Sequence, residues 1–333
     1  MSPTRLLLLA ISALLVISGA AWLSSQRHLE RAIEQGAPLL VGLRDAVNDV
    51  TEIQLSGAGD GRVTLRRDTA GWQLVERSFA ADSNAVRKLL LDLADLRIVE
   101  EKTSDPARYA TLGVEPLSDA QASGVRVDVR AADRNWSVIL GNARGLERIY
   151  ARRSDAAQSF LVTPAATREL DAKRWLDTQL LQITADRIRR VNVRTGGATA
   201  YSVAREAPTQ AALSVEPLPP GRKLTTETAP AALTEALVDL RFEDVRIEAE
   251  PLRTISSETR FETFDGLEVV FEGVGEPQGR WVRIEVRALP AAEAAARELA
   301  QSLAQRLAHR EFQLVGFHYA AIFKPLESML QSR

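Results

Sequence analysis

The chain has 333 residues, 45% of them hydrophobic, and a formal net charge of −2. This length allows two domains of ordinary size, the composition excludes intrinsic disorder, and the near-neutral charge would not attract nucleic acid. The absence of cysteine excludes disulfide bonds, thiolate metal sites, a cysteine nucleophile and a lipidated cysteine.

An apolar segment near the N-terminus predicts a membrane anchor. Leu6–Leu23 contains no charged residue, and as a helix it would be about 27 Å long, close to the thickness of the hydrocarbon core of a bilayer. Trp22 lies at its far end, where an aromatic side chain is favoured at the membrane interface. A signal peptide cleaved after Ser18-Gly19-Ala20 is the alternative. Because the segment stays apolar beyond that site, we favour a retained anchor.

The chain after a predicted stalk at 24–48 reads as short strands and one helix. Alternating apolar and polar residues predict strands near 50–55, 63–65, 72–75, 125–129, 136–140, 149–151 and 160–162. The leucine spacing between Val86 and Leu96 predicts a helix with a cap near Asp82. Thr163-Pro164 predicts a further short helix, with threonine as its N-cap.

The same order of patterns occurs twice. Val50–Leu55 resembles Ile188–Val193, the helix at 86–96 resembles one near 228–240, and the strand at 125–129 resembles the strand at 267–271. We therefore predict an α+β fold that holds two tandem copies of a mainly antiparallel sheet-plus-helix domain, preceded by an N-terminal transmembrane helix. The predicted parts are the anchor at 1–23, the stalk at 24–48, the first repeat at 49–182 and the second repeat at 183–333.

The second copy contains extra sequence. An alanine-rich helix at 291–310 has no counterpart in the first copy, and we expect it to pack on its own sheet; docking of a partner is the alternative. After this insertion, Phe323-Lys324-Pro325 is expected to correspond to Val162-Thr163-Pro164.

The sequence offers no recognisable catalytic motif. Gly57, Gly59 and Gly61 fall in a predicted hairpin and not before a helix, so we expect a turn and no phosphate site. The three histidines, His28, His309 and His318, lack the spacing of metal ligands. We predict no catalytic residue, no cofactor and no bound metal, and the binding residues stay unassigned.

Two charged patterns are expected to be solvated strand edges. Glu100 and Glu101 are adjacent on a strand, so their side chains point to opposite faces and cannot act on one substrate. Glu248 and Glu250 hold the matching place in the second repeat, and Arg187–Arg190 is a short basic run on a strand.

Several short motifs follow one another between Gly71 and Leu181. They are Gly71-Trp72-x-Leu74, Tyr109-x-x-Leu112-Gly113-Val114-Glu115-Pro116, Leu140-Gly141-Asn142, Ile149-Tyr150-Ala151-Arg152 and Trp175-Leu176-Asp177-x-x-Leu180-Leu181. In this order they resemble the bacterial domain-of-unknown-function family 4340. The resemblance implies a membrane-anchored envelope protein, often encoded beside parts of ABC-type transporters similar to the gliding-motility auxiliary system, with no assigned catalytic residues.

We therefore expect a non-enzymatic protein of the bacterial inner membrane that passes the bilayer once, through Leu6–Leu23, with most of the chain on the periplasmic side. It would act as an auxiliary or scaffold of an ABC-type transport complex and bind protein partners in that complex. Contacts are expected from sheet edges, the loop at 106–116 and the inserted helix. The alternative is a solute- or polymer-binding protein that uses a groove between the two repeats, and a hydrolase with an unrecognised site is the third hypothesis.

Overall fold

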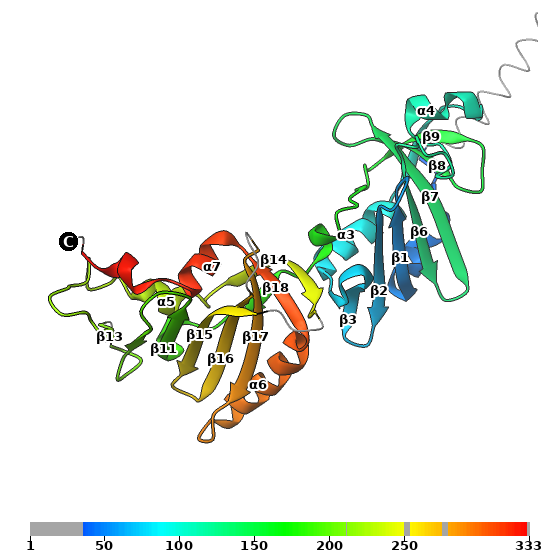
Figure 1. Ribbon diagram of the computed structural model, residues 1–333. Helices are drawn as coiled ribbons and strands as arrows, with labels where there is room; N and C mark the ends of the chain where they lie inside the picture. The colour runs from blue at the N-terminus through cyan, green and yellow to red at the C-terminus, as the bar shows by residue number, and fades with distance from the viewer. Residues whose placement is uncertain (1–35, 211, 250–253, 275–278, 332–333) are drawn as a thin grey trace, which may run out of the picture. The chain divides into compact units, whose positions relative to one another are not determined.

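The computed structural model describes residues 36–331 apart from 211, 250–253 and 275–278 (Figure 1). These residues form two compact units; the first ends at Trp175, the second begins at Leu176, and the short segment Arg77–Phe79 belongs to the second. The chain forms two nine-stranded sheets, one in each unit except that Phe79 at the start of one edge strand is grouped with the second unit, and every strand pair with a defined register is antiparallel. This confirms the predicted α+β class with mainly antiparallel sheets.

The first sheet has the strand order β4-β3-β2-β1-β6-β7-β8-β9-β5. Its strands are β1 (Val50–Ser56), β2 (Arg62–Asp68), β3 (Gly71–Leu74), β4 (Phe79–Ala80), β5 (Arg97–Glu101), β6 (Val125–Ala131), β7 (Arg134–Ala143), β8 (Ile149–Arg153) and β9 (Ser159–Thr163). The helices of this unit are α2 (Leu43–Ala46), α3 (Ser83–Ala94) and α4 (Tyr109–Leu112), and the 3-10 turns of both units are Val47–Asp49, Val75–Arg77, Pro106–Arg108, Ala172–Trp175, Ala185–Arg187 and Leu326–Met329.

Helix α3 forms where the leucine spacing predicts it. Asp82 is its N-cap and accepts hydrogen bonds from the backbone N–H groups of Asn84 and Ala85. Its apolar stripe is buried, with Leu89 and Leu93 fully inaccessible. This stripe therefore belongs to the core of the first unit.

Residues 36–48, which we expected to be the end of a stalk, pack onto the first unit. Leu39, Leu40 and Leu43 are buried, and the Leu39 N–H donates to the carbonyl oxygen of Leu96 at 2.9 Å. The anchor Leu6–Leu23 and the stalk up to residue 35 lie outside the described residues. Within the described ranges, no helix combines the length and hydrophobicity needed to cross a membrane.

The prediction of a helix at Thr163-Pro164 was wrong. Thr163 is the last residue of β9, and its hydroxyl donates to the carbonyl oxygen of Glu147 at 2.9 Å instead of capping a helix. The next helical residues are the 3-10 turn at Ala172–Trp175. The Thr163 hydroxyl is hydrogen-bonded to the connection between β7 and β8 and does not cap a helix, so no helix begins at this threonine.

The second sheet has the strand order β13-β12-β11-β15-β16-β17-β18-β14-β10. Its strands are β10 (Gln179–Leu181), β11 (Ile188–Thr195), β12 (Tyr201–Ala204), β13 (Ser214–Glu216), β14 (Leu240–Ile247), β15 (Ile255–Thr263), β16 (Leu267–Val274), β17 (Trp281–Ala288) and β18 (Arg310–Leu314). The helices are α5 (Ala231–Glu235), α6 (Ala294–Leu307) and α7 (Gly316–Ile322). Four phenylalanines, Phe242, Phe261, Phe271 and Phe312, are fully buried in this unit.

Eight of the nine strands follow the same order in the two sheets, because β3-β2-β1-β6-β7-β8-β9-β5 is matched by β13-β12-β11-β15-β16-β17-β18-β14. The irregularities match as well. The β1–β6 register shifts between Val50 and Glu52, and the β11–β15 register shifts between Ile188 and Arg190. These shared shifts fix which residues of the two units are equivalent.

Two predicted correspondences were wrong. Strand β6 matches β15 and not β16, so 125–129 does not correspond to 267–271. Phe323 follows α7, whereas the place of Val162 in the second sheet is taken by Leu314. The sequence comparison failed because β15 is mostly polar and because α6, between β17 and β18, changes the spacing of the later elements.

Candidate binding site

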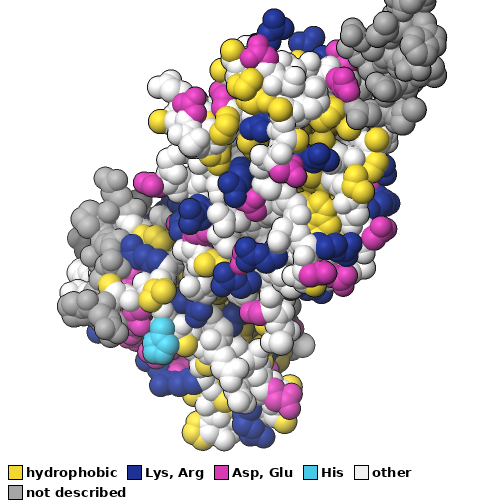
Figure 2. All heavy atoms as spheres, turned by 90° about the vertical axis from the view of Figure 1, so that its right-hand side faces the viewer, with side chains coloured by type: hydrophobic (Ala, Val, Ile, Leu, Met, Phe, Trp, Pro, Cys, Tyr) yellow, Lys and Arg dark blue, Asp and Glu magenta, His cyan; other side chains and the backbone are white. Residues whose placement is uncertain are grey.

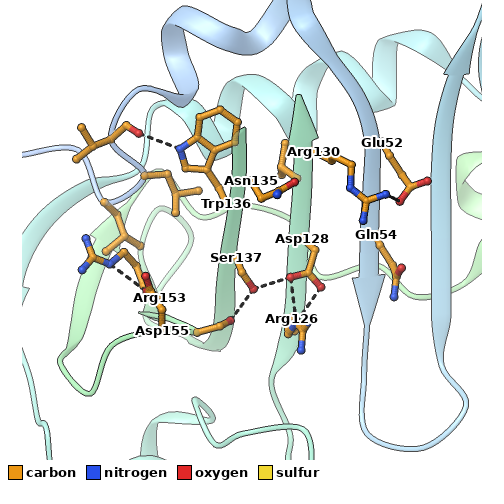
Figure 3. A pocket seen from close by; sticks show the side chains of 15 residues that line it. Glu52, Gln54, Arg126, Asp128, Arg130, Asn135, Trp136, Ser137, Arg153 and Asp155 are labelled. Atoms are coloured by element: carbon orange, nitrogen blue, oxygen red, sulfur yellow. Dashed lines mark hydrogen bonds and ion pairs between the residues drawn. The ribbon is translucent and has the colours of Figure 1, made fainter. Parts of the chain in front are cut away.

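A polar groove of about 710 Å³ lies on the outer face of the first sheet (Figure 3). Successive side chains of a strand point to opposite faces, so the burial of Ile53 and Leu55 turns Glu52 and Gln54 outward. Strands β1, β6 and β7 and two flanking segments supply the lining residues. These are Glu52, Gln54, Arg126, Asp128, Val129, Arg130, Asn135, Trp136, Ser137, Arg153, Ser154, Asp155 and Leu39–Val41.

The charged side chains of the groove are joined in ion pairs. Arg130 Nη1 lies 3.1 Å from Glu52 Oε1 across the β1–β6 pair, and Arg66 Nη2 lies 3.0 Å from the other oxygen of Glu52. On β6, Arg126 Nε lies 2.8 Å from Asp128 Oδ2. The opposite signs balance within the groove, so its polar face is held in place by its own contacts.

The same mixture of charges covers the face of the molecule drawn in Figure 2, where Lys and Arg side chains alternate with Asp and Glu side chains. Such a face has no extended field of one sign. What this face offers is a local arrangement of charges and not a net charge.

Trp136 forms part of one wall of the groove. Its indole Nε1–H donates to the carbonyl oxygen of Val41 at 2.8 Å, so the segment before α2 and strand β7 meet at this side chain. The guanidinium carbon of Arg134 lies 5.5 Å from the centre of the Trp136 ring. The indole is therefore fixed in orientation and brings an aromatic surface to a polar groove.

A second cluster gathers the residues that carry the family resemblance. Tyr109, Val114 and Ile139 pack together, with Leu112 and Tyr150 beside them. They bring the loop at 106–116 onto β7 and β8. The buried side chains of Tyr109 and Val114 are used inside the unit, so they are not available for the partner contact that we expected from this loop.

Two glycines allow the loop to lie directly on the sheet. A Cβ atom at Gly141 would lie 2.2 Å from the carbonyl oxygen of Leu112, and one at Gly124 would lie 2.3 Å from that of Gly113. Backbone atoms cannot yield as a flexible side chain can. The motif Leu140-Gly141-Asn142 therefore reflects close packing.

The histidines lie apart. His309 has a side chain that is 90% exposed, with Nδ1 4.0 Å from Glu248 Oε2, whereas His318 is buried in α7. His28 and Glu250 are outside the described residues. Across the described ranges, no three His, Cys, Asp or Glu side chains are grouped in a way that could hold a metal ion.

The glycine run and the charged runs occupy ordinary structural positions. Gly57 and Gly61 close the turn between β1 and β2 through a backbone hydrogen bond of 2.9 Å, and Gly59 has the left-handed φ of 75°. Glu100 pairs with Lys102 at 2.7 Å, and Arg187 pairs with Asp265 at 2.6 Å.

Sequence reasoning did not single out the groove residues. The sequence feature that points to them is the strict alternation of Val125–Ala131, in which Arg126, Asp128 and Arg130 separate the buried residues. That pattern predicts one polar face but does not show that three strands combine their polar faces into one groove.

The model of one protein family matches residues 72–257, which is more than half of the chain. The matched range includes β6, β7 and the segment 153–155, and so most of the groove, together with the Tyr109 cluster. No curated protein and no solved structure matches the chain. The chain belongs to the family described as a domain of unknown function, DUF4340.

Proposed function

We propose that this protein is a non-enzymatic, membrane-anchored envelope protein that acts as a scaffold of an ABC-type transport complex. In this proposal the outer face of the first sheet holds a protein partner. The observation that carries it is the groove itself, where Glu52, Asp128 and their arginines are fixed by short ion pairs on rigid strands. Fixed charges of alternating sign give a protein interface its specificity and its register.

Two further observations support this proposal. The apolar run Leu6–Leu23 has the length of a membrane span. The common strand order and the common register shifts favour duplication of one unit, and a duplicated binding unit raises avidity without new chemistry.

The test is co-purification of ABC-type transporter subunits with the full chain from membranes. Asp128→Lys reverses one charge in the groove, and we expect it to lower transporter recovery by about tenfold or more. Asp60→Lys makes the same charge change at the exposed β1–β2 turn and should leave recovery unchanged. Equal recovery of the transporter with both variants would contradict a role for the groove. Release of the chain from membranes by a carbonate wash would contradict the membrane anchor.

The groove also favours a second function, the binding of an envelope glycan polymer. It combines the indole of Trp136 with the side-chain amides of Gln54 and Asn135, which are groups that can stack on sugars and bond to hydroxyls. This groove lies within the first unit, unlike the groove between repeats that the sequence suggested. Titration with soluble cell-wall oligosaccharides should quench the tryptophan fluorescence of the native chain but not that of the Trp136→Phe variant. An equal response of the two chains would exclude this function.

A further inference from the structure

The outer faces of the two sheets carry opposite charges at equivalent positions. The shared register shift makes Glu52 equivalent to Arg190, because each is the first residue after the shift on its strand. Their cross-strand partners are Arg130 and Glu262, which are therefore equivalent as well. Both members of this pair are reversed in sign.

The reversal continues along the next positions of β6 and β15. Asp128 is equivalent to Arg260, and Arg126 is equivalent to Glu258. All four charged positions of the first strand pair thus have the opposite sign in the second unit. Gln54 is equivalent to Asn192, and both are neutral amides, whereas Ser56 is equivalent to Arg194, so the second unit has one additional charge.

These side chains are within reach of a partner. In the first unit the side chains of Arg126 and Arg130 are 48% and 62% exposed. In the second unit those of Glu258 and Arg260 are 26% and 30% exposed. Because the signs at these positions are opposite, the row of Glu52 and Arg130 in one unit can meet the row of Arg190 and Glu262 in an attractive contact.

We propose that the outer face of the first sheet of one copy binds the outer face of the second sheet of another copy. One face then stays open on each copy, the second-sheet face of the first copy and the first-sheet face of the other, and a reciprocal contact between these two gives a two-fold symmetric dimer. Exposed ion pairs contribute little affinity individually, so the pattern sets the register of the dimer and makes it sensitive to salt. The dimer uses the face to which the scaffold function assigns the transporter partner, so the two complexes are alternatives, and association of the purified chain tests the dimer independently of the transporter.

The competing explanation is that the two units diverged by exchanging the members of an internal pair. An exchange of Glu52 with Arg130 would leave the cross-strand attraction unchanged and would have no meaning for association. A useful test must therefore preserve the pairs inside each sheet while it changes the pattern that the face presents.

Transplanting one face onto the other meets this requirement. Arg66 pairs with Glu52 and is equivalent to Ala204. The first variant, Glu52→Arg with Arg66→Ala and Arg130→Glu, gives the first unit the pattern of the second. The second variant, Arg190→Glu with Ala204→Arg and Glu262→Arg, makes the opposite change, and a third variant combines all six substitutions.

Association is measured as the mass of the detergent-solubilised full chain by light scattering, at low and high salt. We expect a native dimer that dissociates as salt rises, dissociation constants at least about tenfold higher for both three-residue variants, and recovery of the dimer in the combined variant. As a control, Lys88→Asp with Asp92→Lys exchanges the 2.7 Å ion pair on α3 and should leave the dimer intact.

Three results would overturn the proposal: a native chain that stays monomeric, a dimer that is insensitive to salt, or a combined variant that associates no better than the three-residue variants. Thermal melting of every variant separates loss of association from loss of folding. Each transplanted pattern already exists in the other unit, so each three-residue variant is expected to fold. If one of them unfolds, the salt dependence of the native dimer and the other three-residue variant still decide the question.

Discussion

The guanidinium carbon of Arg152 lies 4.7 Å from the centre of the Tyr109 ring, and both side chains are buried. Arg152 Nε donates to the carbonyl oxygen of Val114 at 3.0 Å, and Nη1 donates to that of Ala156 at 2.9 Å. One side chain thus joins the loop at 106–116 to the turn between β8 and β9.

The second sheet has a buried arginine in the same place. The registers of β5–β9 and β14–β18 make Tyr150 equivalent to Trp281 and so Arg152 equivalent to Arg283. Arg283 Nη1 lies 3.4 Å from Glu248. Both units therefore have a buried arginine at this position, although its partners differ. This supports the descent of the two units from one ancestral unit.

We expect Arg152→Ala to destabilise the first unit by about 3 kcal/mol or more, because it leaves buried carbonyl groups without their donor and opens a cavity beside Tyr109. The neighbouring Arg153 is exposed, so Arg153→Ala should change stability by no more than about 0.5 kcal/mol. Hydrogen exchange of the 106–116 backbone measures both effects within the first unit. Equal protection in the two variants would show that Arg152 does not hold the loop.

Gly141→Ala should displace the loop from β7. The added Cβ would lie 2.2 Å from the carbonyl oxygen of Leu112 and 2.8 Å from Val114 Cγ1, and we expect a loss of about 1–3 kcal/mol. Gly61→Ala is the control, because its Cβ would meet only Leu170 Cδ1 at 3.4 Å. Urea unfolding followed by the fluorescence of the tryptophans measures the difference. Equal losses of unfolding free energy in the two variants would show that the loop does not require a glycine at position 141.

Strands with clear alternation could be predicted from the sequence, and β1, β6 and β7 lie where their patterns place them. The strand β15 could not, because Ser257, Thr259 and Thr263 stand where a typical strand has large apolar residues, and only Phe261 marks its buried face. The buried Thr259 depends on a contact distant in sequence, because its hydroxyl donates to the carbonyl oxygen of Ile322 at 2.8 Å.

The groove depends even more on non-local pairing. Glu52 and Arg130 are 78 residues apart, and only the order of the strands brings them together. The motif of the 106–116 loop was recognised from the sequence, but its partner Arg152 is far along the chain. Local patterns predict which face of a strand is polar, whereas a site also requires knowledge of which strands are neighbours.

Two glutamates of β16 should respond oppositely to neutralisation. Burial alone would raise the pKa of Glu268, but hydrogen bonds from Arg287 and Arg260 outweigh it and hold that pKa below its ordinary value. Burial raises the pKa of Glu272, against the opposing attraction of Arg283. The charged form is therefore favoured at Glu268 and disfavoured at Glu272.

At neutral pH, Glu268→Gln should destabilise the second unit by about 1–3 kcal/mol, because it weakens charge-assisted hydrogen bonds. Glu272→Gln should leave stability unchanged or increase it slightly, since the folded state already resists the charge. The midpoints of urea unfolding compare the two directly. Similar losses in both variants would contradict the assigned electrostatics.

The stability of the second unit should fall as the pH is lowered through the range where histidine titrates. Burial lowers the pKa of His318 below its ordinary value of 6.5, while Asp239 opposes the shift and Arg241 adds to it. Between the folded pKa and 6.5 the unfolded chain binds more protons than the folded chain, so acid favours unfolding. This contribution is fully present above pH 6.5 and is lost as the pH falls toward the folded pKa.

Urea midpoints measured from about pH 7.5 down to about pH 5.5 test this prediction, because carboxylates such as Glu268 titrate at lower pH. His318→Gln should flatten the pH dependence in this range, since glutamine cannot take up the proton. His309→Gln is the matched control; its side chain is 90% exposed, so the native slope should remain. If His309→Gln flattens the curve and His318→Gln does not, the acid sensitivity comes from the exposed histidine and its neighbour Glu248, not from the buried imidazole in α7.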